Sequence, residues 1–434
     1  MVLLDFSSGF DARRLREALN RLKVASDVAD AVRGLIAEVR AGGDAALAAL
    51  TARFDRAEVP ADRLRVPAAE MEAATAALPD ADRAAMVAAI DAIRGYHEQC
   101  RPQDWTSPNL HGGEVGERFY PIRRVGLYIP GGHVPLVSTV LMTAVPARVA
   151  GCPEIAVCTP PQASATVAPA VLAALQLCGI SEVYRVGGVQ AIAGMALGTA
   201  SLPAVDKVFG PGNAYVNEAK RQLFGTVGVD LLPGPSEVLV IADETANPAW
   251  AAADLLAQAE HGTGKEKIYL VTVSAAMREA IVAEMQRQRP SLRHAEAIAA
   301  LLPERFLAMT VASATDAIAA ANIIAPEHLE LLVDAATESR YLDGITTAGA
   351  LLVGHHTPTV FGGFAAGLSH TLPTDTTARF SAGIQTRDFL RRSSIVRYTP
   401  AACEQAAPVV EAFARMEQLD AHGASLRRRL EGQA

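Results

Sequence analysis

The sequence has 434 residues, of which 50% are hydrophobic and 20% are charged, and its formal net charge is −8. A chain of this length and composition supports two or three domains with hydrophobic cores. The acidic balance, with a pI of about 5.7, argues against a nucleic-acid partner, because phosphate binding needs a basic patch. We therefore expect a protein that acts on a small molecule.

The cysteines indicate the cellular compartment of the protein, and the prolines argue against a membrane-spanning segment. None of the five cysteines belongs to a CxxC pair, and Cys152, Cys158 and Cys178 lie in or next to apolar runs. This pattern predicts buried, unreactive thiols in a reducing cytoplasm. Two long uncharged stretches, 125–147 and 155–181, are interrupted by prolines, so we expect no membrane span.

The first 120 residues are predicted to be mainly helical, because they are rich in Ala, Arg, Leu and Glu at helical spacing. In segment 27–40 the apolar side chains share one helical face, and these are Val28, Val32, Leu35, Ile36 and Val39. Gly42 and Gly43 predict the end of this helix.

After residue 120, apolar strands alternate with helices. The first set of strands is expected at 125–129, 154–158, 182–186, 205–209 and 229–232. A second set is expected at 238–242, 268–273, 308–311, 331–333 and 350–353. Such alternation is typical of parallel sheets with helices on both faces. We predict an α/β fold of two Rossmann-like, doubly wound parallel-sheet domains, with a helical N-terminal region and a small C-terminal tail.

Glycine-rich turns follow three strands of the first set. They are the segments Tyr128 to Gly132, Val186 to Gln190, and Phe209 to Asn213. Each precedes a helix, at the place where open α/β sheets bind ligands. None is a GxGxxG motif, and no acidic residue is evident some twenty positions later. A single turn of this kind is commonly structural, but three at consecutive strand ends indicate a cofactor-binding edge.

Two pairs of side chains are candidates for chemistry. Gln258 and His261 lie three residues apart, so on a helix they share a face and could bind one metal atom, although such a pair is often only solvated. Glu327 and His328 follow Pro326 and precede an apolar strand. This pair could supply a general base and activate a water, or it could be a capping Glu and a surface His.

Three further titratable residues are weak candidates by themselves. His370 lies in a polar loop with no structural need for an imidazole. Glu417 and His422 are five residues apart near the C-terminus, a spacing that does not place them on one helical face. For all three, an exposed position is the simpler interpretation.

Together these segments resemble the histidinol dehydrogenase family, from about residue 20 to residue 430. The matching motifs, in order, are VGLYIPGG, VGGVQAIA, VFGPGNAYV, GPSEVLVIAD, DLLAQAEHG, APEHLEL, SHTLPT and LDAH. The resemblance implies oxidation of L-histidinol through histidinal to L-histidine, with two NAD and one water. It also implies a homodimer in which the partner's C-terminal segment completes the active site.

The resemblance also implies a role for each matched position. Catalysis would use His328 to accept the alcohol proton and Glu327 to deprotonate a water. The cofactor positions are Tyr128, Gln190 and Asn213. The substrate positions are Ser236, Gln258, His261, His328, His370, Glu417 and His422. The zinc positions are Gln258, His261 and His422.

One expected zinc ligand is missing. The family has an Asp a few residues before the SHTLPT loop, and this chain has Gly363 there. Gln and two His are neutral, so a zinc ion would lose the anionic ligand that offsets its charge. Asp254 or Asp375 could substitute. We expect one zinc per subunit, retained more weakly than in the family.

The resemblance divides the chain into functional parts. Residues 1–25 would be a helical extension, 26–127 with 237–384 a catalytic and metal-binding domain, and 128–236 the NAD-binding domain. Residues 385–434 would be a dimerisation tail that ends in a helix at 406–430. Two alternatives remain open: a family paralogue that oxidises another small polar alcohol, and a catalytically silent NAD-binding homologue.

Overall fold

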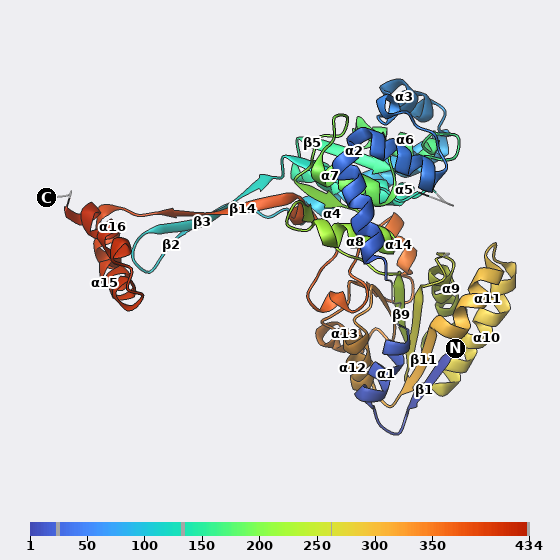
Figure 1. The fold of residues 1–434 in the computed structure, drawn as a ribbon. Coiled ribbons are helices and arrows are strands. Elements are labelled where there is room, and N and C mark those ends of the chain that lie inside the picture. Colours follow the sequence, from blue (N-terminus) through green and yellow to red (C-terminus); the bar gives the residue numbers. More distant parts are fainter. Residues whose placement is uncertain (23–26, 132–134, 262, 432–434) are drawn as a thin grey trace.

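A computed structural model describes residues 1–22, 27–131, 135–261 and 263–431. Two parallel sheets, each with helices on both faces, form the body of the molecule, and a long arm projects from it (Figure 1). The α/β fold with two doubly wound parallel sheets is therefore confirmed.

The first sheet has the strand order β6-β5-β4-β7-β8. Its strands are β4 (Arg124–Tyr128), β5 (Glu154–Thr159), β6 (Glu182–Arg185), β7 (Lys207–Phe209) and β8 (Gly228–Val229). One face packs against α2 (Ala29–Asp55), α7 (Gly188–Leu197) and α8 (Ala214–Leu223). The other packs against α3 (Ala68–Ala76), α4 (Asp80–Gln99), α5 (Val137–Ala150) and α6 (Pro169–Leu177). The chain changes direction across the sheet between β4 and β7, which is where dinucleotides bind in such folds.

The second sheet has the order β1-β11-β10-β9-β12-β13. Its strands are β1 (Val2–Phe6), β9 (Glu237–Ala242), β10 (Lys267–Thr272), β11 (Phe306–Val311), β12 (His328–Leu332) and β13 (Ala350–Val353). One face packs against α9 (Pro248–Ala259), α10 (Ala275–Gln288) and α11 (Ala295–Arg305), and the other against α1 (Ala12–Arg21), α12 (Ala314–Ile324) and α13 (Glu338–Gly344). Burial on both faces explains why these strands are almost uniformly apolar.

The arm consists of β2 (Trp105–Pro108), β3 (Glu114–Pro121), β14 (Leu390–Arg397), α15 (Pro400–Met416) and α16 (Asp420–Glu431). Its three strands form an antiparallel ribbon that carries the two helices away from both sheets (Figure 1). The single helix expected at 406–430 is wrong, because the chain turns at Gln418, whose φ is 56°. The short helix α14 (Thr359–Phe364) and the 3₁₀ turns Ala61–Arg63, Arg289–Ser291, Thr377–Arg379 and Thr386–Phe389 complete the elements.

The expected grouping of the N-terminal segments needs correction. The extension at 1–25 is not only helical, since β1 is an edge strand of the second sheet, paired with β11. Segment 26–127 packs little against 237–384, although α4 meets Gly367 and Ile384. Its helices α2, α3 and α4 cover the first sheet instead, because their apolar faces fit α5 to α8. The chain leaves helical geometry at Gly43, with φ 52° and ψ −132°, so α2 consists of two helices joined at a kink where Gly42 and Gly43 predict a helix end.

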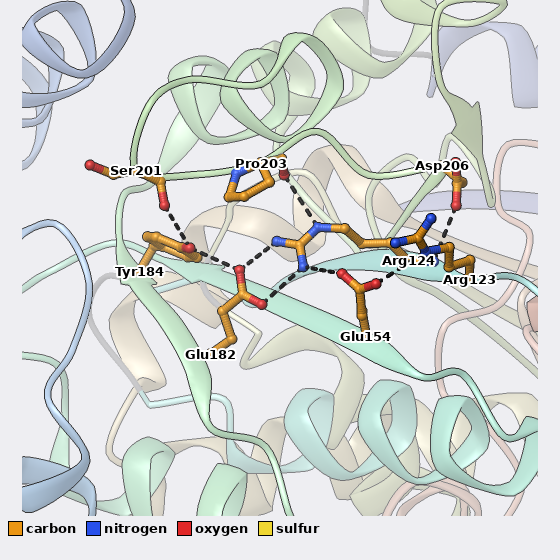
Figure 2. A network of polar contacts seen from close by, with 8 residues as sticks. All are labelled: Arg123, Arg124, Glu154, Glu182, Tyr184, Ser201, Pro203 and Asp206. Carbon is orange, nitrogen blue, oxygen red and sulfur yellow. Dashed lines mark hydrogen bonds and ion pairs between the residues drawn. The ribbon is translucent and has the colours of Figure 1, made fainter.

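A buried polar network fixes the amino ends of β4, β5 and β6 (Figure 2). The Arg124 side chain, only 11% exposed, donates to Glu154 and Glu182 and to the Pro203 carbonyl. The Tyr184 hydroxyl adds a hydrogen bond of 2.8 Å to Glu182. Because the Arg124 guanidinium and the Glu182 carboxylate find partners, the network stabilises the sheet edge opposite the glycine-rich turns.

Candidate active site

The Glu327–His328 pair lies at the amino end of β12 and is held by one residue of the neighbouring strand. The Glu327 side chain is almost completely buried, and its carboxylate accepts a hydrogen bond of 2.8 Å from the backbone amide of Glu237. His328 places Nδ1 3.2 Å from the carbonyl oxygen of Glu237. The pair is therefore neither a helix cap nor a surface feature. Gly349 is required beside it, because a Cβ there would lie 2.6 Å from the Glu327 carbonyl oxygen.

Two further imidazoles, those of His261 and His370, lie near enough to His328 to influence its pKa. Burial lowers the pKa of His328 to about 4, with contributions from His370 and His261. Burial also lowers the pKa of His370 to about 4, and His261 contributes again. Neutral imidazoles are therefore favoured at His328 and His370. In contrast, burial raises the pKa of Glu327 well above its usual range, and the charge of Glu237 adds to this shift.

Gln258 and His261 lie at the C-terminal end of α9. His261 directs Nδ1 toward the Gln258 carbonyl oxygen at 3.1 Å, which leaves Nε2 available. The Gln258 side chain is 3% exposed, and its Nε2 has no hydrogen-bond partner in the described part of the chain. The Gln258 amide is thus available to a ligand, because buried amides are normally paired.

Zinc does not fit the residues of a single chain. Glu417 and His422 lie on the arm, away from Gln258 and His261 (Figure 1). Gly363 on α14 adds no donor, although it lies beside His370, since a Cβ there would lie 3.9 Å from the Cβ of His370. Within residues 1–22, 27–131, 135–261 and 263–431, no three His, Cys, Asp or Glu side chains form a metal-binding group.

The two carboxylates considered as substitute ligands have other partners. Asp375 forms an ion pair with Lys267. Asp254 lies against Glu330, whose pKa is raised to about 8 by burial and by this neighbour. Among the described residues, neither carboxylate forms a hydrogen bond or an ion pair with the side chain of Gln258 or His261.

The glycine-rich turns meet at the carboxyl ends of β4, β6 and β7. Tyr128 is buried at the end of β4, and its hydroxyl accepts a hydrogen bond of 3.1 Å from the amide of Gly188, at the start of α7. The Gln190 side chain is 1% exposed, and its Nε2 has no partner among the described residues. Asn213 caps α8 through its side-chain oxygen. Gly132, part of the first turn, lies outside the described residues.

This edge also contains an acidic group that sequence reasoning missed. Asp55, the last residue of α2, lies near Tyr128 and the second turn, and its Oδ2 is buried without a partner in the described structure. Burial raises its pKa to about 6. We expected an acid some twenty residues after a turn, whereas this one precedes the sheet and arrives from a separate helix. No local pattern around Asp55 distinguished it.

The glycine-rich edge and the imidazoles are connected. Thr139 lies in the first turn of α5, the helix that follows β4, and its hydroxyl is 3.3 Å from Nε2 of His370. Ser236, an expected substrate position, directly precedes Glu237 at the start of β9. Glu327 and His328 share the backbone of Glu237, and the charges of His261 and His370 influence His328. Gln258 contacts His261 through its carbonyl oxygen, whereas Glu417 and His422 lie on the arm.

A dinucleotide-type edge beside a buried carboxyl–imidazole pair defines an α/β oxidoreductase. The comparisons with known proteins agree. The family model described as histidinol dehydrogenase matches residues 19–430. The chain therefore belongs to the histidinol dehydrogenase family and is an NAD-dependent oxidoreductase. In the described residues, no helix has the length and apolar character needed to cross a membrane.

Relatives match almost the whole chain. The histidinol dehydrogenase of Rhizobium meliloti is 44% identical over 94% of this chain and 93% of its own length. That of Agrobacterium fabrum is 44% identical over 98% of this chain and 97% of its own length. The crystal structure of histidinol dehydrogenase from Elizabethkingia anophelis has a TM-score of 0.94 and 34% identity, covering 100% of this chain and 98% of that one.

Proposed function

We propose that this enzyme oxidises L-histidinol through histidinal to L-histidine, with reduction of two NAD and consumption of one water. The observation that carries the proposal is the burial of Glu327 and His328 on the backbone of Glu237, beside His370. The 44% identity with histidinol dehydrogenases supports the substrate.

His328 is suited to accept the proton of the alcohol. Its Nδ1 faces a carbonyl oxygen, so Nδ1 carries the ring hydrogen and Nε2 is left unprotonated. Nε2 can take the hydroxyl proton as hydride leaves the carbon for NAD. Because the imidazole is neutral at physiological pH, it needs no prior deprotonation.

Glu327 is suited to the second oxidation. As a carboxylate it would remove a proton from a water that adds to the aldehyde, and the resulting hydrate would give its hydride to a second NAD. Its raised pKa makes it a stronger base than an exposed carboxylate once it is ionised. The balance is one alcohol, two NAD and one water, giving one carboxylate, two NADH and three protons. No cysteine is required.

The glycine-rich edge would hold NAD through Tyr128, Gln190 and Asn213. The unpaired amide of Gln190 supports this role, because a bound cofactor would supply the missing acceptor. A dinucleotide bound there would reach the imidazoles along α5, whose Thr139 already contacts His370. NAD supplies the hydride acceptor.

A second copy of this chain would complete the site. The arm exposes large apolar side chains, including Val396 at 65%, Phe413 at 55% and Met416 at 64%. An extended arm with this surface is suited to a partner subunit. We propose a homodimer in which the arm brings Glu417 and His422 to the other subunit's substrate. The cysteines of the chain bear on its compartment. Cys152, Cys158 and Cys178 are buried as expected, which suits a cytoplasmic enzyme.

The test is the stoichiometry of NADH. With limiting L-histidinol and excess NAD, we expect two NADH per substrate, with L-histidine as the product. One NADH per substrate, or none, would refute the proposal. Because Gly363 removes an expected metal ligand, a paralogue for another small polar alcohol is the second candidate. Faster turnover of such an alcohol than of histidinol, with and without added zinc, would favour it.

A further inference from the structure

We propose that Glu237, paired with Lys267, is the positioning residue of this active site: its backbone fixes the Glu327–His328 pair, and its carboxylate holds the loop at 369–376 that carries His370. The inference rests on the proposed function for its kinetic test, and a spectroscopic test below is independent of it. Four contacts of Glu237, with four different residues, support it.

The backbone of Glu237 contacts both members of the pair. Its amide donates to the Glu327 carboxylate at 2.8 Å, and its carbonyl oxygen lies 3.2 Å from Nδ1 of His328. The parallel register explains this double contact, because β9 and β12 begin side by side, with Val238 opposite His328. One peptide segment therefore sets the distance between the base and the imidazole.

The carboxylate of Glu237 contacts the loop. Its Oε1 accepts a hydrogen bond of 2.8 Å from Nζ of Lys267 and one of 3.2 Å from the backbone amide of Asp375. Lys267 also pairs with the Asp375 carboxylate. Asp375 and Thr376 have φ values of 51° and 69°, a left-handed conformation that is unfavourable for Thr and needs support from outside the loop. The ion pairs provide that support.

The titratable groups around Glu327 come from three strands and one loop. Glu237 starts β9, Lys267 starts β10, and His328 follows Glu327 at the start of β12; Asp375 approaches from the loop. Glu237 and Lys267 are buried, and so is Glu327. Burial alone would lower the pKa of Lys267, but Glu237 and Asp375 raise it, so Lys267 stays charged. Burial raises the pKa of Glu237 itself, and the charge of Lys267 opposes that shift. When Glu237 is ionised, its charge disfavours ionisation of Glu327.

The kinetic test uses Glu237→Gln and Asp375→Asn. Glu237→Gln removes the negative charge and weakens the loop tether, so we expect the acidic limb of the kcat profile to move down by about one pH unit. The same variant should raise KM for histidinol several-fold. Asp375→Asn keeps the backbone hydrogen bond to Glu237 but removes the ion pair between the loop and Lys267, so KM should rise while the acidic limb stays in place. Asp375 is 44% exposed in its side chain, so folding of this variant is expected.

The matched control is Glu182→Gln. Glu182 is also a shielded partner of a cation, Arg124, with its side chain 19% exposed, but it lies in the network of Figure 2 at the far edge of the other sheet. This variant should lose stability without a change in the pH profile or in KM. If Glu182→Gln and Glu237→Gln changed the pH profile and KM equally, Glu237 would have only a structural role.

The spectroscopic test needs no turnover. In protein labelled with ¹³C at Glu carboxyl carbons, the Glu327 signal is the one lost in Glu327→Gln, and its titration is followed with and without Glu237→Gln. We expect a lower midpoint in the variant, and an unchanged midpoint would overturn the inference. If Glu237→Gln does not fold, Asp375→Asn decides, because an unchanged KM would overturn it. A wild-type enzyme inactive on histidinol refutes only the proposed substrate.

Discussion

Burial of the Glu327 carboxyl group makes it more basic and also makes the folded protein less stable when this group is ionised. Its pKa in the folded protein is raised above the value of about 4.3 that an exposed Glu has. The folded state therefore binds a proton that the unfolded state has lost, and the free energy of unfolding falls as pH rises above about 4.3 toward the raised pKa. Stability and catalysis are opposed at this residue.

Glu327→Gln should separate the two effects. Its side-chain oxygen still accepts from Glu237, while the ionisable group is gone, so the variant should gain thermal stability over wild type at pH 8 but not at pH 5. Turnover should fall by about 10²–10⁴-fold, the usual contribution of a general base. Thermal unfolding at both pH values measures the first effect. The same gain at both would contradict a buried, protonated carboxyl group.

Gly363 offers a direct test of the metal question. Gly363→Asp places a carboxylate near His370, in a position with room for a Cβ, so retention of zinc after dialysis should increase. Gly363→Ala is the control, because it fills the space without a ligand. Metal content per subunit, measured by mass spectrometry, gives the result. One firmly held zinc in the wild type would show that Gly363 does not weaken the site.

The site was predictable where its residues lie in recognisable motifs. Gln258, His261 and the Glu327–His328 pair lie next to apolar runs that end at turn residues, which is why the sequence singles them out. Glu237 and Asp55 were not predictable. A carboxylate at the start of a strand or the end of a helix has no local pattern, and its role depends on which distant segment packs against it.

At the scale of elements, the kink in α2 is the clearest backbone constraint. Gly43, at φ 52° and ψ −132°, adopts a conformation that is costly for any residue with a Cβ, although the space around it is open. The kink lets the two halves of α2 follow the same face of the first sheet, where Leu35 and Leu47 are both buried.

Gly43→Ala should therefore destabilise the protein by about 1–3 kcal/mol. Gly34→Ala is the matched control, since Gly34 is an exposed position earlier in the same helix with nothing within 4 Å of a Cβ. It should be neutral or stabilise by up to about 1 kcal/mol. Urea unfolding of both variants gives the comparison, and similar losses would mean that the kink tolerates an ordinary residue.

The ten strands of the two sheets that follow residue 120 were predictable because they are short apolar runs between turn residues. β1, β2, β3 and β14 were not. β1 and β14 have partners that are distant in sequence. β2, β3 and β14 lie in the arm and carry charged or polar side chains, which conceal the strand pattern. β3 and β14, for example, pair Glu117 with Ser394 and Phe119 with Arg392.

At the scale of the whole molecule, the arm separates two groups of residues that the proposed reaction needs together. Subunit mixing tests the shared site. Glu327→Gln disables the body and Glu417→Gln the arm, so each homodimer should be nearly inactive. In a heterodimer one site combines an intact body with an intact arm. Random re-pairing of equal amounts should restore about a quarter of wild-type activity.

The matched control is a mixture of Glu327→Gln with His328→Ala. Both changes lie in the body, so every re-paired site remains defective. NADH formation after mild dissociation and re-association measures the outcome. Recovery in the control as well, or in neither mixture, would mean that Glu417 does not act across subunits.

The edge strand β1 has a consequence for biosynthesis. Its partner is β11, with Val2 opposite Leu307, so the opening residues of the chain leave the ribosome long before the segment that will receive them. The first sheet, with all its helices between residues 29 and 223, can assemble while β1 is still unpaired. Nascent chains should therefore expose an apolar strand through most of translation, which makes this N-terminus a natural binding point for a chaperone.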